Sequence, residues 1–251
     1  MSVKLKIVVP TYNTEGWIQR CLASISHQAF RDWECVIIND ASTDRTGEVI
    51  DSLDFVKNDP RFRVIHNEVN VKALKNIVDG FNHLDCKSDP DCVMMVIDGD
   101  DFLFSEYSLY IVNEAYTQYP QVLLTYGNWV GHPDGTDSNC QPYTPETVRN
   151  NRFRYDPFVA SHLRTFRSKL WYSIKDEDLR DDEGNYFEAG WDVAFMMPML
   201  EMAHERHLYI PNRLYCYNRQ NPISDFKVRE DKQLSAVDIV TKRKPYTRVE
   251  F

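Results

Sequence analysis

Residues 93–101, Val-Met-Met-Val-Ile-Asp-Gly-Asp-Asp, decide how this chain folds. The five apolar residues 93–97 predict a strand buried on both faces of a sheet. The strand runs directly into the carboxylates of Asp98, Asp100 and Asp101, and Gly99 allows the backbone to turn tightly between them. Carboxylates packed this closely raise one another's pKa unless a cation lies among them.

This acidic turn has two interpretations. A hard divalent ion such as Mg²⁺ or Mn²⁺ is held by one or two carboxylates and completed by phosphates and water, which predicts a metal–diphosphate site. Asp-Gly-Asp-Asp is also ordinary turn chemistry that can cap the next helix. These nine residues alone leave both interpretations open.

Strands and helices alternate over the first hundred residues. Apolar patterning predicts strands at 4–9, 33–38, 62–65 and 93–97, and helices at 17–25, 45–56 and 74–84. This alternation is typical of a mostly parallel twisted sheet with right-handed crossovers, flanked by helices. Ligands bind beyond the carboxyl ends of such strands, where three polar turns fall, at 10–13, 39–44 and 98–101. Three turns converging on one edge favour a functional cleft.

The pattern changes after residue 101 and predicts a smaller, mixed C-terminal half. The expected elements are a helix at 107–119, a strand at 122–127, a polar loop at 131–145, a strand at 158–166, a charged linker at 176–184, a helix at 190–203 interrupted by Pro198, two short strands around Pro211-Asn212, and a weak helix at 235–240. We expect one α/β domain over 1–224, with an N-terminal nucleotide half (1–101) and a C-terminal half (102–224), followed by a C-terminal extension (225–251).

Composition narrows the class of protein. A chain of 251 residues can bury a sizeable core, and a net charge of −9 argues against a nucleic-acid partner. The cationic residues clustered between 227 and 248 are expected to form a solvated tail. The six cysteines show no metal-binding spacing and are expected to be reduced. With no apolar run of bilayer length and no signal-like start, we expect a soluble cytoplasmic protein.

Three ordered motifs point to a family. Val-Val-Pro-Thr-Tyr-Asn (8–13), Ile-Ile-Asn-Asp-Ala-Ser-Thr-Asp (37–44) and Ile-Asp-Gly-Asp-Asp (97–101) together resemble the family 2 glycosyltransferases of the GT-A fold. The resemblance covers the first hundred residues well and continues more loosely to about residue 224, through Trp191-Asp192 and 215–219. Each motif alone is weak, but the ordered set is specific.

The resemblance implies a nucleotide-diphosphate-sugar donor, with a UDP-sugar expected. Residues 1–101 would then be the nucleotide-sugar half and residues 102–224 the acceptor half. Asp40 would accept a hydrogen bond from the ring N–H of the base, Asp98 would bind the ribose, and Asp100 would coordinate a divalent cation, Mn²⁺ or Mg²⁺. Asp101 would bind sugar hydroxyls or orient its neighbours. The other nucleotide-sugar-binding residues implied are Pro10, Thr11, Tyr12, Asn13, Lys75, Gly99, Trp191 and Arg219. Lys75 stands where the family usually has Arg, and Gln220 stands where it often has His.

The resemblance also implies an inverting transfer, which needs a general base to take the proton of the acceptor hydroxyl. Asp192 is the expected base, and Glu188 is the substitute candidate. Asp192 could instead be a carboxylate that only interacts with a helix N-terminus. Trp191 replaces the usual Glu and offers either an aromatic face for a sugar ring or core bulk. His162 and Arg164 are further polar candidates.

The acceptor is expected to be a hydroxyl of a glycan, polysaccharide, protein or small molecule. Two other functions stay open. A nucleotidyltransferase on a related scaffold needs a Gly-rich basic loop after the first strand, and residues 10–13 have neither glycine nor a cationic side chain. A non-catalytic nucleotide-sugar-binding module is supported only by Trp191 and Gln220.

Overall fold

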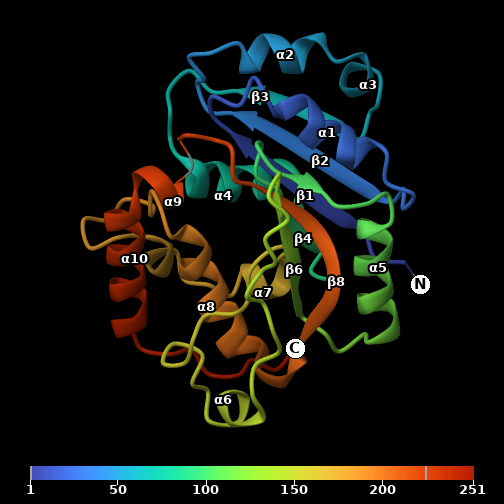
Figure 1. Ribbon diagram of the computed structural model, residues 1–251. Helices are drawn as coiled ribbons and strands as arrows, with labels where there is room; N and C mark the ends of the chain where they lie inside the picture. The colour runs from blue at the N-terminus through green and yellow to red at the C-terminus, as the bar shows by residue number, and fades with distance from the viewer. Residues whose placement is uncertain (1, 224) are drawn as a thin grey trace.

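An eight-stranded sheet forms the centre of the molecule (Figure 1), in a computed structural model that describes residues 2–223 and 225–251. Position 224, the expected end of the domain, lies outside the described residues. The strand order is β3-β2-β1-β4-β7-β6-β8-β5. The strands are β1 (Leu5–Thr11), β2 (Trp33–Asn39), β3 (Phe62–His66), β4 (Val93–Val96), β5 (Phe102–Leu103), β6 (Leu124–His132), β7 (Thr165–Arg167) and β8 (His207–Asn218).

The first four strands pair in parallel, as predicted. Strand β7 is antiparallel to both of its neighbours, β4 and β6. Beyond it, β6 and β8 are parallel and β5 closes the edge antiparallel to β8. The sheet therefore joins a parallel N-terminal half to a mixed C-terminal half, and β7 is the junction.

Helices cover both faces of the sheet. They are α1 (Ile18–Ser26), α2 (Thr46–Ser52), α3 (Asp54–Lys57), α4 (Ala73–His83), α5 (Ser108–Gln118), α6 (Pro145–Arg149), α7 (Ser168–Trp171), α8 (Trp191–Ala203), α9 (Asp225–Val228) and α10 (Glu230–Lys242). Leu5, Ile7 and Val9 of β1 pack in one apolar cluster with residues of α1, α2 and α5. Val8 faces the other cluster, with residues of α4, α7 and α8. Burial on both faces explains why the strand sequences are continuously apolar.

Several element boundaries differ from the sequence predictions. The helix expected at 45–56 is divided into α2 and α3, because Leu53 between them is extended. The strand expected at 158–166 is reduced to β7, so the residues before Thr165 form a loop. Pro198 does not interrupt α8, which is continuous from Trp191 to Ala203. Short elements β5 and α6 were not predicted.

The two strands expected around Pro211-Asn212 are one strand, β8. Strand β6 continues past its expected end at Gly127 and pairs with β8 as far as His132. Register shifts on both sides of Asn128 accommodate the additional residues of β8. A bulge of this kind lets a strand bend without ending, so the proline did not terminate the pairing.

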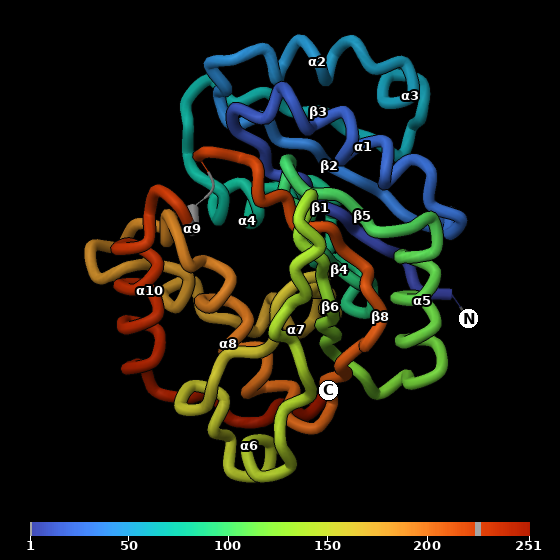
Figure 2. Tube along the Cα trace, viewed as in Figure 1, coloured from blue at the N-terminus to red at the C-terminus, as the bar shows by residue number. Residues whose placement is uncertain are grey.

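The C-terminal residues are packed against the rest of the chain, so the expected solvated tail is only partly correct. Helix α10 lies beside α8, on the opposite side of the molecule from α5 (Figure 2), and its Ala236 and Val240 are buried. The buried guanidinium of Arg154 donates to the carboxylate of Glu201 and to the carbonyl of Val240. No helix in residues 2–223 and 225–251 has the length and apolarity needed to cross a membrane.

Candidate active site

A cavity of about 580 Å³ opens where β1, β2 and β4 end. The three polar turns predicted to converge line it together, and the start of α8 closes the opposite side. The expected site residues that line the cavity are Pro10, Thr11, Tyr12, Asn13, Asp40, Asp98, Gly99, Asp100, Asp101, Trp191 and Asp192.

The turns after β1 and β4 fit together because one residue between them has no side chain. A Cβ atom on Gly99 would lie 2.3 Å from Oγ1 of Thr11, which is closer than any Cβ contact tolerates. The turns after β1 and β2 are joined by Asn13, whose Oδ1 accepts from the backbone N–H of Thr43 at 2.8 Å. Asn13 adopts a positive φ of 52°, which asparagine tolerates better than most residues.

Asp40 holds the segment that leads into α4. Its carboxylate accepts hydrogen bonds from the backbone N–H groups of Val71 at 2.9 Å and Lys72 at 2.8 Å, and from Nδ2 of Asn67 at 2.9 Å. A carboxylate has about four acceptor positions, so one remains on Asp40 for a ligand donor. The residue expected to bind a base therefore also shapes the loop beside it.

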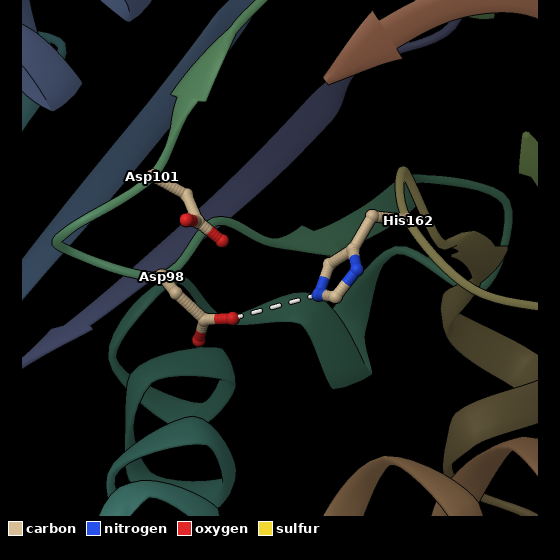
Figure 3. A group of neighbouring side chains, drawn as sticks. All are labelled: Asp98, Asp101 and His162. Carbon is tan, nitrogen blue, oxygen red and sulfur yellow. Dashed lines mark ion pairs between the residues drawn. The ribbon is translucent and has the colours of Figure 1, made fainter. Parts of the chain in front are cut away.

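Asp98, Asp101 and His162 form a compact cluster (Figure 3), with candidate ligand atoms within 4.8 Å of one another. Nε2 of His162 lies 3.6 Å from Oδ2 of Asp98. Oδ1 of Asp101 accepts from the backbone N–H of Asn218, whereas its buried Oδ2 has no hydrogen-bond partner among the described residues. An orphaned buried carboxylate oxygen beside a second carboxylate and an imidazole is a donor set that fits a divalent cation.

The electrostatics of the acidic turn agree with that donor set. Burial raises the pKa of Asp98 to about 6, although the charge of Arg164 opposes this rise; the charge of Asp192 adds to it. Burial and the nearby Asp98 raise the pKa of Asp100 to about 6, and burial also raises the pKa of Asp101. Burial, with the adjacent Arg164, lowers the pKa of His162, so its imidazole is neutral near pH 7. A bound cation would stabilise the ionised form of these carboxylates, and a neutral imidazole is the form that can coordinate it.

Asp100 lies beside this cluster and is not one of its three members. Its Oδ2 accepts from Nδ2 of Asn221 at 2.7 Å. Gln220, which stands where the family often has His, is exposed and does not line the cavity, whereas Asn221 does.

In the first turn of α8, the carboxylate of Asp192 is paired with Arg164. An amino group of the buried guanidinium donates to Oδ2 of Asp192 at 2.7 Å. Glu188, the substitute base, also lines the cavity, and its carboxylate is paired with Lys232 of α10. Trp191 is 9% exposed and packs against Phe195, so it contributes to the core and to the cavity wall.

Two expected binding residues lie outside the cavity. Lys75 is paired with Asp79 at 2.5 Å on the surface of α4. Arg219 is paired with Asp134 at 3.0 Å and donates to Oγ1 of Thr136. Lys72, three residues before Lys75, lines the cavity instead.

Tyr215 supports the cluster and was missed at the sequence level. Its ring stacks on His162 with 4.6 Å between centroids, and its hydroxyl accepts from the backbone N–H of Asp98 at 3.1 Å. Tyr215 lies in an apolar-looking strand more than a hundred residues from Asp98, so no local signal could reveal the contact.

Comparisons with known proteins agree with this geometry. A model of the family described as Glycosyl transferase family 2 matches residues 6–174. The glycosyltransferase GlyG of Streptococcus pneumoniae is 38% identical over 234 residues, covering 88% of this chain and 72% of GlyG. The uncharacterized glycosyltransferase EpsJ of Bacillus subtilis is 26% identical, covering 88% of this chain. This chain spans only 62% of the length of EpsJ.

Solved structures share the fold. A fragment of TarS from S. aureus in complex with UDP-GlcNAc matches with a TM-score of 0.63 at 20% identity, covering 87% of this chain and 59% of the fragment. The mannosyltransferase PcManGT from Pyrobaculum calidifontis, in complex with GDP-Man and Mn²⁺, matches with a TM-score of 0.61 at 15% identity, covering 98% of this chain and 66% of that one. The expected GT-A fold class is confirmed.

Proposed function

Because this chain belongs to glycosyl transferase family 2, we propose that it transfers a sugar from a UDP-sugar to a hydroxyl acceptor with inversion. The observation that carries the proposal is one cavity lined both by the cluster of Asp98, Asp101 and His162 and by a separate carboxylate, Asp192, at the start of α8. Among structural neighbours, the TarS fragment is in complex with UDP-GlcNAc and PcManGT with GDP-Man.

The nucleotide end of the donor would lie over the turns that follow β1 and β2. Thr11 and Tyr12 line this end, and the remaining acceptor position of Asp40 suits the ring N–H of uracil. Asp98, at the end of β4, is then positioned for the ribose and for the cation. The base, the ribose and the cation would then lie in turn along the edge formed by the ends of β2, β1 and β4.

We propose that a divalent cation binds at Asp98, Asp101 and His162, with Asp100 adjacent to it. The imidazole favours Mn²⁺ over Mg²⁺, which prefers oxygen ligands. When bound, such an ion neutralises charge on the departing diphosphate. PcManGT is in complex with Mn²⁺, which supports this choice.

The variant Tyr215→Phe tests whether Tyr215 supports cation binding by Asp98, Asp101 and His162. The variant keeps the ring that stacks on His162 but loses the hydroxyl that holds the backbone of Asp98, so we expect Mn²⁺ affinity to fall by about 10–100-fold. Calorimetric titration of Mn²⁺ measures this. Tyr209→Phe is the control, because its hydroxyl bonds to Asn128 and Cys140 outside the cavity. Unchanged Mn²⁺ affinity in Tyr215→Phe contradicts the support role.

Asp192 would accept the proton of the acceptor hydroxyl. Arg164 fixes its Oδ2, which leaves Oδ1 to face the hydroxyl. The acceptor would enter between α8 and the residues of 221–233 that line the cavity. We propose that residues 225–251 work as part of the acceptor half, since α10 packs on Gly190 at the start of α8.

A ligand screen tests the proposed function. We expect UDP and a UDP-sugar to raise the Tm of the protein, with a larger rise when Mn²⁺ is present, because ligands that bind only the folded state stabilise it. Slow release of UDP from the matching UDP-sugar should accompany binding. GDP, CDP and ADP serve as controls.

Other outcomes separate the alternatives. Stabilisation by UDP without any donor turnover, across sugars and acceptors, would support a non-catalytic binding module. Formation of pyrophosphate from UTP and a sugar phosphate would support a nucleotidyltransferase. No response to any nucleotide would refute the proposal.

A further inference from the structure

Lys72 has a backbone conformation that lysine rarely adopts. Its φ of 73° and ψ of 164° lie in a region used almost only by glycine. The carboxylate of Asp40 maintains this conformation by accepting from the backbone N–H groups of Val71 and Lys72. A strained residue persists when its surroundings determine it and often marks a ligand contact.

Lys72 contributes a cationic side chain to the lining of the cavity. The cationic side chains that line the cavity among the described residues are those of Lys72, Arg164 and Arg229. Arg164 is bound to Asp192, and Arg229 donates to the carbonyl of Glu188. Among the side chains that the structure describes, those of residues 2–223 and 227–251, the ammonium of Lys72 has no hydrogen-bond or ion-pair partner.

The charge of Lys72 also reaches across the cavity. The pKa of Glu188 on the opposite wall is lowered chiefly by its bond to Lys232, and further by the charges of Lys72 and Arg229. Lys72 and Glu188 both line the cavity, and their charges are close enough to interact.

The groups beside Lys72 in the cavity lining are also hydrogen-bond donors. Lys72 immediately precedes α4, whose N-terminal residue Ala73 lines the cavity. Nδ2 of Asn76, a residue only 1% exposed, has no hydrogen-bond partner in the part of the chain that the structure describes. The Asn76 amide is oriented by Asn67, which donates to its Oδ1 at 2.8 Å. Helix N-termini, free amide N–H groups and an ammonium all favour an anion.

We propose that Lys72 binds the diphosphate of the donor nucleotide, whereas the resemblance at the sequence level implied Lys75 and Arg219 as the cationic residues that bind the nucleotide sugar. This inference rests on the proposed function, because it assumes a nucleoside-diphosphate donor in this cavity. Asp40 then has two effects: it faces the base, and it holds Lys72 in the backbone conformation that directs the ammonium to the phosphates.

The test compares Lys72→Met and Lys72→Gly with the wild-type protein by calorimetric titration with uridine, UMP and UDP in the presence of Mn²⁺. Both variants should bind UDP about 10–100-fold more weakly, because each loses a charge-assisted hydrogen bond. Binding of uridine should stay unchanged. Lys72→Gly should have a higher Tm than Lys72→Met, because glycine relieves the strained backbone and methionine does not.

Three further variants make the result specific. Lys57→Met removes an exposed positive charge paired with Asp54 on α3 and should leave UDP affinity unchanged. Lys72→Arg should restore most of the affinity. If Lys75→Met weakens UDP binding and Lys72→Met does not, the inference is overturned and the sequence assignment is correct.

Failure of the inference differs from failure of the proposed function. Wild-type protein that binds no uridine nucleotide refutes the function itself. Wild-type protein that binds UDP, with a Lys72→Met variant that binds it equally well, refutes only the role of Lys72. An equal loss for uridine and UDP assigns Lys72 to the base and also overturns the diphosphate contact.

Discussion

Asp192→Asn should lower the rate of sugar transfer by about 10²–10⁴-fold, the usual contribution of a general base, while donor affinity stays within about twofold of wild type. The amide keeps the size of the side chain and an oxygen that can accept from Arg164, but it cannot take a proton. The measurement is release of UDP from the donor under saturating conditions, with UDP affinity determined separately by calorimetry.

Glu188→Gln is the matched control for this experiment. Glu188 lines the same cavity four residues earlier, and its carboxylate is already neutralised by Lys232. We expect its transfer rate to stay within about threefold of wild type, since it loses an exposed ion pair of small value. A larger loss in Glu188→Gln than in Asp192→Asn would move the base to Glu188. Loss of UDP binding in Asp192→Asn would show that Asp192 supports the fold of the donor site.

The N-terminal half of the cavity was predictable because its signals are local. Each polar turn follows a buried strand, and parallel strands bring their carboxyl ends to one edge. Residues 10–13, 40 and 98–101 could therefore be brought together without any knowledge of tertiary contacts. The prediction of one helix at 45–56 was wrong because a single extended residue, Leu53, divides a continuous apolar pattern into two helices.

The remaining site residues depend on contacts between distant parts of the chain. His162 and Arg164 lie in a loop that was predicted as a strand, and their partners are Asp98 and Asp192. The choice between Lys72 and Lys75 depends on which of them meets an acidic neighbour, and Asp79 lies one helical turn from Lys75. The spacing of Lys75 and Asp79 could be read from the sequence, but the pairs His162–Asp98 and Arg164–Asp192 could not, because their members are far apart in the chain.

Asp98→Asn should abolish the stabilisation by Mn²⁺ and, in the absence of cations, make the folded protein more stable at pH 7.5. The wild-type cluster holds close carboxylates with raised pKa values, and the amide removes one of their charges. Converting the pKa shift of Asp98 gives about 3 kcal/mol; since 25% of its side chain is exposed, we expect about 2 kcal/mol, or a rise of about 4–8 °C in Tm. Thermal unfolding in chelator and in Mn²⁺ measures both effects.

The pH dependence identifies the origin of this gain. The pKa of Asp98 is raised from 3.8 to about 6 by folding, so below about pH 4 the carboxyl is protonated in both states and the two proteins should be equally stable. As the pH rises from 4 to 6, the unfolded wild-type chain ionises before the folded one, and the folded state of the wild type loses stability relative to the variant. Above about pH 6 the difference should be constant. Asp238→Asn, which removes an exposed carboxylate on α10, should show no such profile. A variant that is less stable than wild type at pH 7.5 in chelator would mean that Asp98 is held by favourable contacts, and that the acidic corner has no need of a cation.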